Sequence, residues 1–378
     1  MRFAAGMSAA ARTTMLYPSL LLAAQTAVAS FGSNPGALQM YEHVPASLPS
    51  GAPLVVVLHG CTQTASSMES SGWDALADQY GFAVAYPQQQ SANNIESCFN
   101  WYDGTTDDAR GAGEAESVAQ MVAYEVTTHG VDPKRVFVTG FSAGAAFTAV
   151  LAATYPDVFA AASIMSGLPY DCATDITSAY SCMNPGVTKT ADQWGTLVRA
   201  AYASSAYPRI QIWQGASDTT VAPMNAGELA KQWTDALGVA MTATSMDMVG
   251  SAARTIYGND AVETYVVSGM DHAVALGTDG SIACPGTAGL YFEDHGVCST
   301  VHAAQFFGIV PGGAAAGSGS SGGPGNPGGS DGGSNGNGAP DGPGAPGAGG
   351  CDVGARDGGG AAVLGLALAL VLRSRRRR

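Results

Sequence analysis

The segment that most constrains the fold of this chain is 135–155. It begins with a Val-Phe-Val run, and β-branched and aromatic residues favour a buried strand. Gly-Phe-Ser-Ala-Gly follows at 140–144, and the Ala-, Leu- and Val-rich run 145–155 favours a helix. A Gly-x-Ser-x-Gly motif matches by chance in some Gly/Ser loops, but between a strand and a helix it indicates a nucleophile elbow. The sequence therefore predicts that Ser142 is a nucleophile.

Apolar runs that suit strands alternate with segments of helical periodicity along the rest of the chain. The continuous run Leu54–Leu58 is typical of a strand covered on both faces of a parallel sheet. Further strands are expected at 82–86, 161–165, 210–214, 242–249 and 263–267, and helices at 73–80, 114–128, 227–237 and 301–307. Residues 166–194 are expected to form a long irregular insertion. This order predicts an α/β-hydrolase fold with a mostly parallel central sheet, helices on both faces, and a site at the carboxyl ends of the strands.

A serine nucleophile needs a base within hydrogen-bond reach, and that base is oriented by a third group. In α/β-hydrolases the acid follows the serine along the chain, and the histidine comes last. Asp218 stands in a loop directly after the predicted strand 210–214, which is where such an acid would lie. Aspartates in such loops are also common helix caps. The competing acids Asp171, Asp175 and Asp192 fall in the irregular insertion.

The expected general base is His272, in the loop after the predicted strand 263–267. His295 and His302 are the alternatives, the first between two cysteines and the second on the last predicted helix. Asp271 is adjacent to His272 in the sequence and is expected to point elsewhere.

Acyl transfer builds negative charge on the carbonyl oxygen, so an oxyanion hole of backbone N–H groups is needed. One donor should be Ala143, the residue after the nucleophile. The other should come from the loop after the first core strand, where Cys61 and Thr62 both remain candidates. His59 precedes the nucleophile and is expected to shape this loop.

Seven cysteines suggest disulfides in an exported chain. Proximity pairs Cys172 with Cys182 and Cys284 with Cys298. With Cys351 set aside in the tail, Cys61 pairs with Cys98 by elimination. Six cysteines permit many other connectivities, so this pairing is one of several. No metal site is expected, because there is no C-x-x-C motif and the histidines are not spaced as ligands.

The two ends differ from the middle of the chain. Residues 1–29 combine Arg2 and Arg12 with an apolar stretch and end on Ala-Val-Ala, which predicts a secretory signal peptide. Residues 30–310 are the expected catalytic domain, and the Gly- and Pro-rich residues 311–350 are the expected linker. Residues 30–350 hold 8 of the 16 Lys and Arg and 28 of the 30 Asp and Glu, a net charge of −20. Such an acidic chain is a poor partner for nucleic acid or anionic lipid.

Residues 351–378 begin with Cys351, continue through an uncharged apolar stretch, and end in five arginines after residue 372. Fifteen residues of helix span only ~22 Å, less than a hydrocarbon core of ~30 Å. The order resembles the C-terminal sorting tails of myxobacterial surface proteins. The resemblance implies transient membrane association, a sorting protease acting near Cys351, and an extracellular or cell-surface location. A stable membrane anchor is the alternative.

Six motifs in order resemble those of the poly(3-hydroxybutyrate) depolymerase esterases, which are related to secreted feruloyl and acetylxylan esterases. They are Leu-His-Gly-Cys-Thr-Gln at 58–63, Phe-Asn-Trp at 99–101, Arg-Gly-Ala-Gly-Glu at 110–114, Val-Asp-Pro-Lys-Arg-Val at 131–136, Gly-Phe-Ser-Ala-Gly at 140–144 and Ser-Gly-Leu-Pro-Tyr at 166–170. The resemblance covers roughly residues 38–308. It implies an extracellular serine esterase with the triad Ser142, Asp218 and His272 and no cofactor, and it supports the pairing of Cys284 with Cys298.

The sequence thus predicts a secreted serine carboxylic-ester hydrolase that acts through an acyl-enzyme. Its substrate would be a polyester, a hydroxycinnamoyl or acetyl polysaccharide, or a small ester. Val274 stands where the family often has Trp, and the linker leads to a tail rather than to a substrate-binding domain. Both features favour a polysaccharide ester or a small ester over a polyester. Trp101 is expected either to line the substrate cleft or to pack in the core. A peptidase on the same scaffold and a displayed binding module with a vestigial triad are the alternatives.

Overall fold

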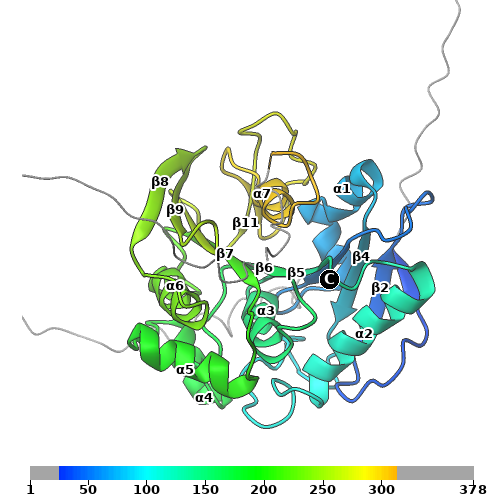
Figure 1. Ribbon diagram of the computed structural model, residues 1–378, viewed down its shortest axis with the longest axis horizontal. Coiled ribbons are helices and arrows are strands. Elements are labelled where there is room, and N and C mark those ends of the chain that lie inside the picture. The colour runs from blue at the N-terminus through cyan, green and yellow to red at the C-terminus, as the bar shows by residue number, and fades with distance from the viewer. Residues whose placement is uncertain (1–24, 313–378) are drawn as a thin grey trace, which may run out of the picture. The chain divides into compact units, whose positions relative to one another are not determined.

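The computed structural model describes residues 25–312, and their central feature is a ten-stranded sheet (Figure 1). The strand order is β1-β2-β4-β3-β5-β6-β7-β10-β9-β8. The strands are β1 (Thr26–Val28), β2 (Gln39–His43), β3 (Leu54–Leu58), β4 (Ala83–Gln88), β5 (Val136–Phe141), β6 (Ala161–Met165), β7 (Arg209–Gly215), β8 (Ala243–Val249), β9 (Ala252–Tyr257) and β10 (Val262–Val267). The six strands from β4 to β10 in this order are parallel, and the outer strands on both edges are antiparallel. The α/β-hydrolase fold with a mostly parallel sheet is therefore confirmed.

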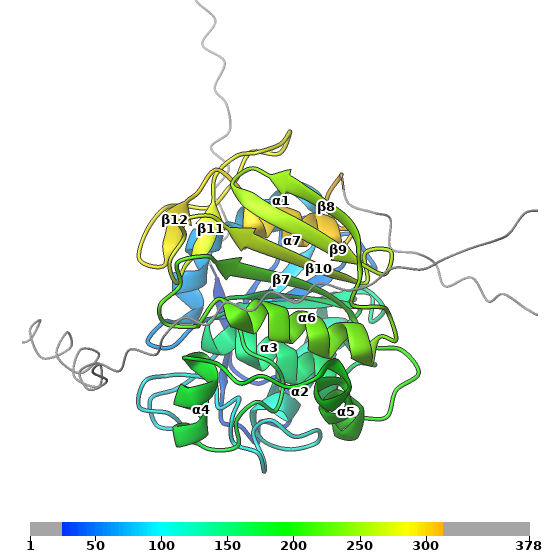
Figure 2. The same ribbon diagram turned by 90° about the vertical axis from the view of Figure 1, so that its left-hand side faces the viewer.

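Two layers of helices cover the sheet, and the residues of β3 show why. Leu54, Val56 and Leu58 belong to one apolar cluster, whereas Val55 and Val57 belong to the other, because alternate side chains of a strand point to opposite faces. The helices are α1 (Trp73–Tyr80), α2 (Gly113–His129), α3 (Ala143–Thr154), α4 (Ile176–Met183), α5 (Ala191–Ala201), α6 (Met224–Ala236) and α7 (Ser299–Phe306), with a 3-10 helix η1 (Ala65–Ser71). Helices α1 and α7 lie on one side of the sheet and α2 to α6 on the other (Figure 2).

The structure corrects the prediction for residues 166–194. This segment contains the helix α4 and the start of α5 rather than irregular chain. Asp175 accepts hydrogen bonds from the N–H groups of Thr177 and Ser178, and Thr190 accepts one from Gln193, so each helix begins at a capping box. Asp175, an alternative acid in the sequence, is thus a helix cap.

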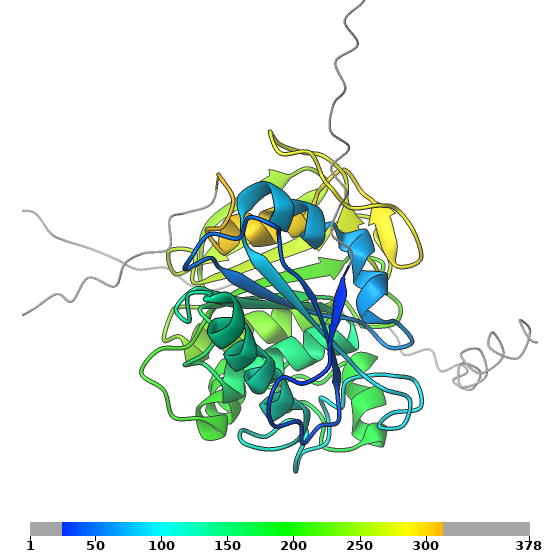
Figure 3. The same ribbon diagram turned by 90° about the vertical axis from the view of Figure 1, so that its right-hand side faces the viewer.

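Five further strands were not predicted. β1 and β2 extend one edge of the sheet (Figure 3), and β9 completes the other edge between β8 and β10. A small parallel pair, β11 (Val274–Leu276) and β12 (Phe292–Asp294), follows the last strand of the large sheet.

Three disulfides join Cys61 to Cys98, Cys172 to Cys182, and Cys284 to Cys298. These are the pairs that proximity and elimination predict from the sequence.

The ends of the chain bear on the predicted domain boundaries. The predicted linker from residue 313 on and the tail 351–378 lie outside the described residues, as do residues 1–24 of the predicted signal peptide. The last residues of that peptide form β1, so a cut after Ala29 would remove β1 and leave β2 at the edge. Within residues 25–312, no helix is both long and apolar enough to cross a membrane.

The glycines of the elbow explain how tightly α3 is packed against the sheet. A Cβ atom on Gly144 would lie 2.5 Å from the carbonyl oxygens of both Leu58 and His59. We expect Gly144→Ala to lower the free energy of unfolding by about 2–3 kcal/mol, because backbone must move to admit the methyl group. Gly227→Ala is the control: Gly227 is on α6, meets nothing within 4 Å, and should gain about 0.5–1 kcal/mol. Urea unfolding of both variants measures the difference, and equal stabilities would contradict this account of the packing.

Candidate active site

Three side chains meet at the carboxyl ends of parallel strands. Ser142 follows β5, Asp218 lies in the loop after β7, and His272 lies in the loop after β10. The Ser142 Oγ lies 2.9 Å from His272 Nε2, and His272 Nδ1 lies 2.8 Å from Asp218 Oδ2. The structure therefore brings the predicted nucleophile, base and acid into one hydrogen-bonded chain.

The backbone of Ser142 holds its side chain at the apex of the turn. Its φ is 55° and its ψ is −119°, outside the regions that L residues ordinarily occupy. The Ser142 N–H donates to the carbonyl of Met165 on the neighbouring strand. A Cβ on Gly140 would lie 2.4 Å from the backbone of Gly144, so the turn closes only with glycine at these positions. The motif therefore reflects steric constraint on both sides of the serine.

Asp218 is almost fully buried, and all its hydrogen bonds favour the carboxylate. Oδ1 accepts the N–H groups of Thr220 and Val221, and Oδ2 accepts from His272 and from Gln214 Nε2. Burial alone would raise the pKa of Asp218, but the hydrogen bond and charge of His272 and the two backbone N–H groups outweigh it and lower the pKa. Asp218 is thus held ionised beside the imidazole.

The imidazole of His272 lies against two aromatic rings. Its centroid is 4.8 Å from the ring of Phe141 and 6.3 Å from the ring of Tyr291. The sequence does not indicate a role for Tyr291, because this residue lies far along the chain within the loop closed by Cys284 and Cys298. No local pattern indicates that this loop folds back over the elbow.

The other candidate acids and bases have different partners. Asp271 accepts the Thr219 N–H at 3.1 Å and does not contact the imidazole of His272. His295 pairs with Glu293 and His302 with Asp279.

The two candidates for the second oxyanion donor differ in their hydrogen bonds. The Thr62 N–H donates to the carbonyl of Glu96 at 2.6 Å, so it is already engaged. The N–H groups of Cys61 and Ala143 have no acceptor among the described residues. Gly60 permits the approach of this loop to the nucleophile, because a Cβ there would lie 3.2 Å from the Ser142 Cβ. Cys61 and Ala143 are therefore the N–H groups free to receive an oxyanion.

His59 is buried beneath this loop, as a structural role requires. Its Nε2 accepts the Gln89 N–H at 3.1 Å, which leaves Nδ1–H to donate to the carbonyl of Gly60 at 2.7 Å. Burial lowers the pKa of His59 to about 4, so the ring stays neutral at physiological pH. The Gly60 N–H in turn donates to Gln63 Oε1. These bonds fix the loop that carries the Cys61 N–H.

Comparison with known proteins places this site in a family. The family model described as esterase PHB depolymerase matches residues 37–256, which is more than half of the chain. The chain belongs to the PHB depolymerase esterase family. It is a carboxylic ester hydrolase, as its relatives and the fold both indicate.

Three relatives illustrate the range of this family. Poly(3-hydroxyalkanoate) depolymerase C of Paucimonas lemoignei is 49% identical over 320 residues, covering 79% of this chain and 77% of the relative. Feruloyl esterase B of Talaromyces funiculosus is 35% identical over 270 residues, covering 68% and 76%. The solved structure of an acetyl xylan esterase from Aspergillus awamori has a TM-score of 0.65 at 30% identity, covering 76% of this chain and 100% of that one.

The structure places Trp101 in the core rather than on an open wall of this esterase's site. The side chain is 5% exposed and packs edge-on against Tyr102, with ring centroids 5.2 Å apart. Buried Glu114 accepts hydrogen bonds from the Asn100 N–H and side chain and from Gln89 Nε2, and this holds the loop against α2. The sequence leaves core packing open for Trp101, and this is what the structure has.

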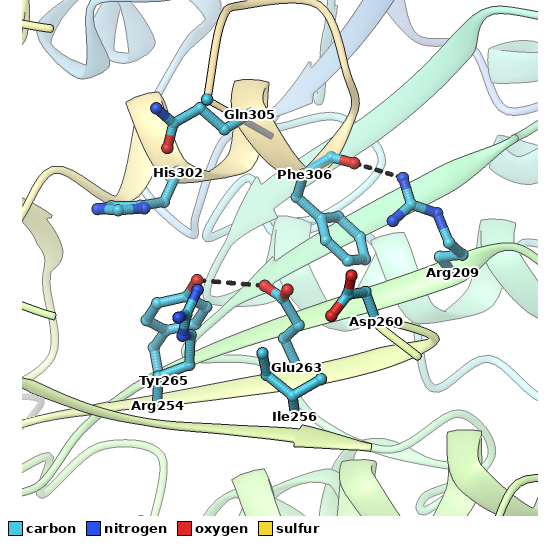
Figure 4. Close-up of a pocket in the computed structure, with 10 residues that line it drawn as sticks. Arg209, Arg254, Ile256, Asp260, Glu263, Tyr265, His302, Gln305 and Phe306 are labelled. Carbon is cyan, nitrogen blue, oxygen red and sulfur yellow. Dashed lines mark hydrogen bonds between the residues drawn. The ribbon is translucent and has the colours of Figure 1, made fainter. Parts of the chain in front are cut away.

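A separate cavity of about 250 Å³ lies at the opposite end of β7 (Figure 4). Arg209, the first residue of β7, lines it, whereas Asp218 comes after the last residue of that strand. Arg209 donates to the carbonyl of Phe306, and Tyr265 donates to Glu263. The Arg209 guanidinium and the Glu263 carboxylate therefore both have neutral hydrogen-bond partners, and the residues that line the cavity include no nucleophile paired with a base.

Proposed function

We propose that Ser142, His272 and Asp218 are the catalytic triad of this esterase, with the Cys61 and Ala143 N–H groups as its oxyanion hole. The observation that carries the proposal is the continuous hydrogen-bonded chain from Ser142 Oγ through His272 to Asp218. Such a chain is what activates a serine hydroxyl for acyl transfer.

In the proposed mechanism each group has one step. Ser142 Oγ attacks the ester carbonyl while His272 Nε2 takes its proton, and the two N–H groups stabilise the oxyanion. His272 then gives the proton to the leaving alcohol, and an acyl-enzyme forms. Water then attacks the acyl-enzyme while His272 Nε2 takes a proton from it. His272 returns a proton to Ser142 Oγ, which releases the acid and the free serine. Asp218 orients the imidazole and stabilises it when charged.

We further propose that the natural substrate is an insoluble aliphatic polyester of the poly(3-hydroxyalkanoate) class. The 49% identity to a depolymerase of such polymers supports this choice over the less similar feruloyl and acetylxylan esterases. Exposed apolar side chains on three segments next to the site also support it. Ile95 precedes Glu96, whose carbonyl accepts the Thr62 N–H. Tyr180 lies on α4, which contacts the loop that carries Asp218. Leu290 precedes Tyr291, whose ring lies beside His272. Ile95, Tyr180 and Leu290 are 88%, 65% and 79% exposed.

The test compares a polymer film with a soluble ester. Ile95→Ser and Leu290→Ser should each slow the hydrolysis of poly(3-hydroxybutyrate) film roughly fivefold, since each removes about 1 kcal/mol of contact with an apolar surface. Turnover of p-nitrophenyl butyrate should stay within about twofold. Met246→Ser is the matched control, because Met246 is 74% exposed but lies on the edge strand β8.

The other outcomes separate the alternatives. Film left intact with rapid turnover of methyl ferulate or acetylxylan would replace the polyester with a plant cell-wall ester. Cleavage of a peptide panel would indicate a peptidase. A folded protein that neither turns over any ester nor reacts with a fluorophosphonate would indicate a binding module.

We propose that the chain is exported by its N-terminal segment and directed to the cell surface by residues 351–378. The three disulfides support an oxidising compartment. N-terminal sequencing of the exported protein would locate the cut relative to β1, and mass spectrometry would detect processing at Cys351. Finding the intact chain only in the cytoplasm would contradict the proposal.

A further inference from the structure

Glu42, Glu125 and His129 converge at the edge of the sheet that carries β2. Glu42 lies on β2, and Glu125 and His129 lie four residues apart near the end of α2, on one face of the helix. The candidate ligand atoms of the three side chains all lie within 4.8 Å of one another, and His129 Nε2 is 3.1 Å from Glu42 Oε2. The blue edge strands and α2 face the viewer in Figure 3.

The second observation is that the Glu125 carboxylate is buried without a partner. Glu125 is 0% exposed, and neither of its side-chain oxygens has a hydrogen-bond partner in the described part of the chain. The Glu42 carboxylate, which carries a like charge, is the acidic group beside it. Among residues 25–312, no Lys or Arg pairs with either carboxylate. A buried carboxylate in this position requires either a cation or a proton.

We propose that Glu42, Glu125 and His129 bind a divalent transition-metal ion, with Zn²⁺ as the best match. Two carboxylates and one imidazole are hard-to-borderline ligands that suit Zn²⁺ and, next, Mn²⁺. Bonds of ~2.1 Å to a tetrahedral ion require ligand atoms about 3.4 Å apart, so small side-chain rotations close the site. The Glu42 and His129 side chains are 13% and 22% exposed, which leaves solvent access for a water as fourth ligand.

The ion would have a structural role. It would tie the last turn of α2 to the strand β2, and its positive charge would lie near the C-terminus of the helix, where a cation is favourable and a lone Glu125 is not. β2 is separated by β4 and β3 from β5, and Ser142 directly follows β5. Loss of the ion should therefore affect stability without affecting the chemical step.

Isolated pairs of His and carboxylate elsewhere in the structure provide the comparison. His295 lies 2.9 Å from Glu293 Oε2 but is not part of a three-residue ligand cluster. Glu293→Gln is therefore a matched control for Glu125→Gln, because each removes one carboxylate beside a histidine.

The experiment uses the full chain, purified without a polyhistidine tag and stripped with a chelator at pH 7.5. Titration with Zn²⁺ should show one tight site per chain in the wild type and in Glu293→Gln, and a Tm raised by about 5 °C at a hundredfold excess over Kd. Glu125→Gln and, separately, His129→Ala should weaken this site at least tenfold and lose the rise in Tm. Esterase turnover should stay within twofold in all variants.

Co²⁺ in place of Zn²⁺ gives a second readout. A tetrahedral absorption spectrum without a thiolate band should appear in the wild type and not in Glu125→Gln, which excludes binding at Cys351. Equal Zn²⁺ affinity in wild type and Glu125→Gln would overturn the proposal. Absence of a tight site in the wild type would overturn it as well, and would mean that Glu125 and Glu42 share a proton instead.

Discussion

Ser142→Ala should lower kcat/KM for p-nitrophenyl butyrate by about 10⁴–10⁶-fold, because no other group can form the acyl-enzyme. The variant removes the hydroxyl that lies 2.9 Å from His272 Nε2. The fold should survive, since the side chain makes no other hydrogen bond among the described residues and alanine is smaller. Labelling by a fluorophosphonate should disappear together with turnover.

Ser166→Ala is the matched control for this loss. Ser166 follows the neighbouring strand β6, has the same φ of 55°, and is buried with no partner for its hydroxyl in the described residues. Its substitution should leave turnover within a fewfold of the wild type. Activity that survives Ser142→Ala but not Ser166→Ala would move the nucleophile to the next strand.

Asp218→Asn should lower kcat by about 10⁴-fold with little change in KM. The amide oxygen of the new Asn would keep the N–H groups of Thr220 and Val221, which turns its NH₂ toward His272. That NH₂ is a donor, so His272 Nδ1 must become the acceptor and Nε2 must carry the proton. In this tautomer Nε2 no longer accepts a proton from Ser142.

Asp271→Asn is the control, because Asp271 is adjacent to His272 in the chain yet accepts the Thr219 N–H. We expect less than about a tenfold effect. A larger loss in Asp271→Asn than in Asp218→Asn would exchange the roles of the two acids.

The lowered pKa of Asp218 also predicts a pH dependence of stability. An acid whose pKa is lower in the folded state stabilises the fold above its unfolded pKa and loses this contribution as the pH falls through its folded pKa. The free energy of unfolding should therefore fall more steeply below about pH 4 in the wild type than in Asp218→Asn. Urea titrations between pH 3 and 7 measure both curves.

Much of the site was predictable because its constraints are local. The elbow motif is fixed by steric limits at Gly140 and Gly144, and both Asp218 and His272 come directly after strands whose ends must meet at one edge of the sheet. The choice between Cys61 and Thr62 was not predictable, since it depends on a hydrogen bond to Glu96 across a disulfide-closed loop.

Other features of the fold could not be predicted, because the sequence patterns that would indicate them are weak. β1, β2 and β9 lie at or next to the edges of the sheet and have few continuous apolar residues, and α4 has a short apolar face. The sequence leaves open whether Trp101 lines a cleft or packs in the core, because the burial of an aromatic side chain in a loop depends on which distant segments pack against it. The spacing of Cys and His does not reveal the cluster of Glu42, Glu125 and His129, because its members come from a strand and a helix that are far apart in the sequence.

The disulfides have a consequence for where this enzyme becomes competent. Cys61–Cys98 anchors the loop with the free N–H, Cys172–Cys182 lies at the helix beside the acid, and Cys284–Cys298 closes the segment that carries Tyr291. Each bond thus ties down a segment that contacts part of the proposed site. A chain kept in a reducing compartment would lack all three bonds, so these segments would be held less firmly there than in an oxidising one.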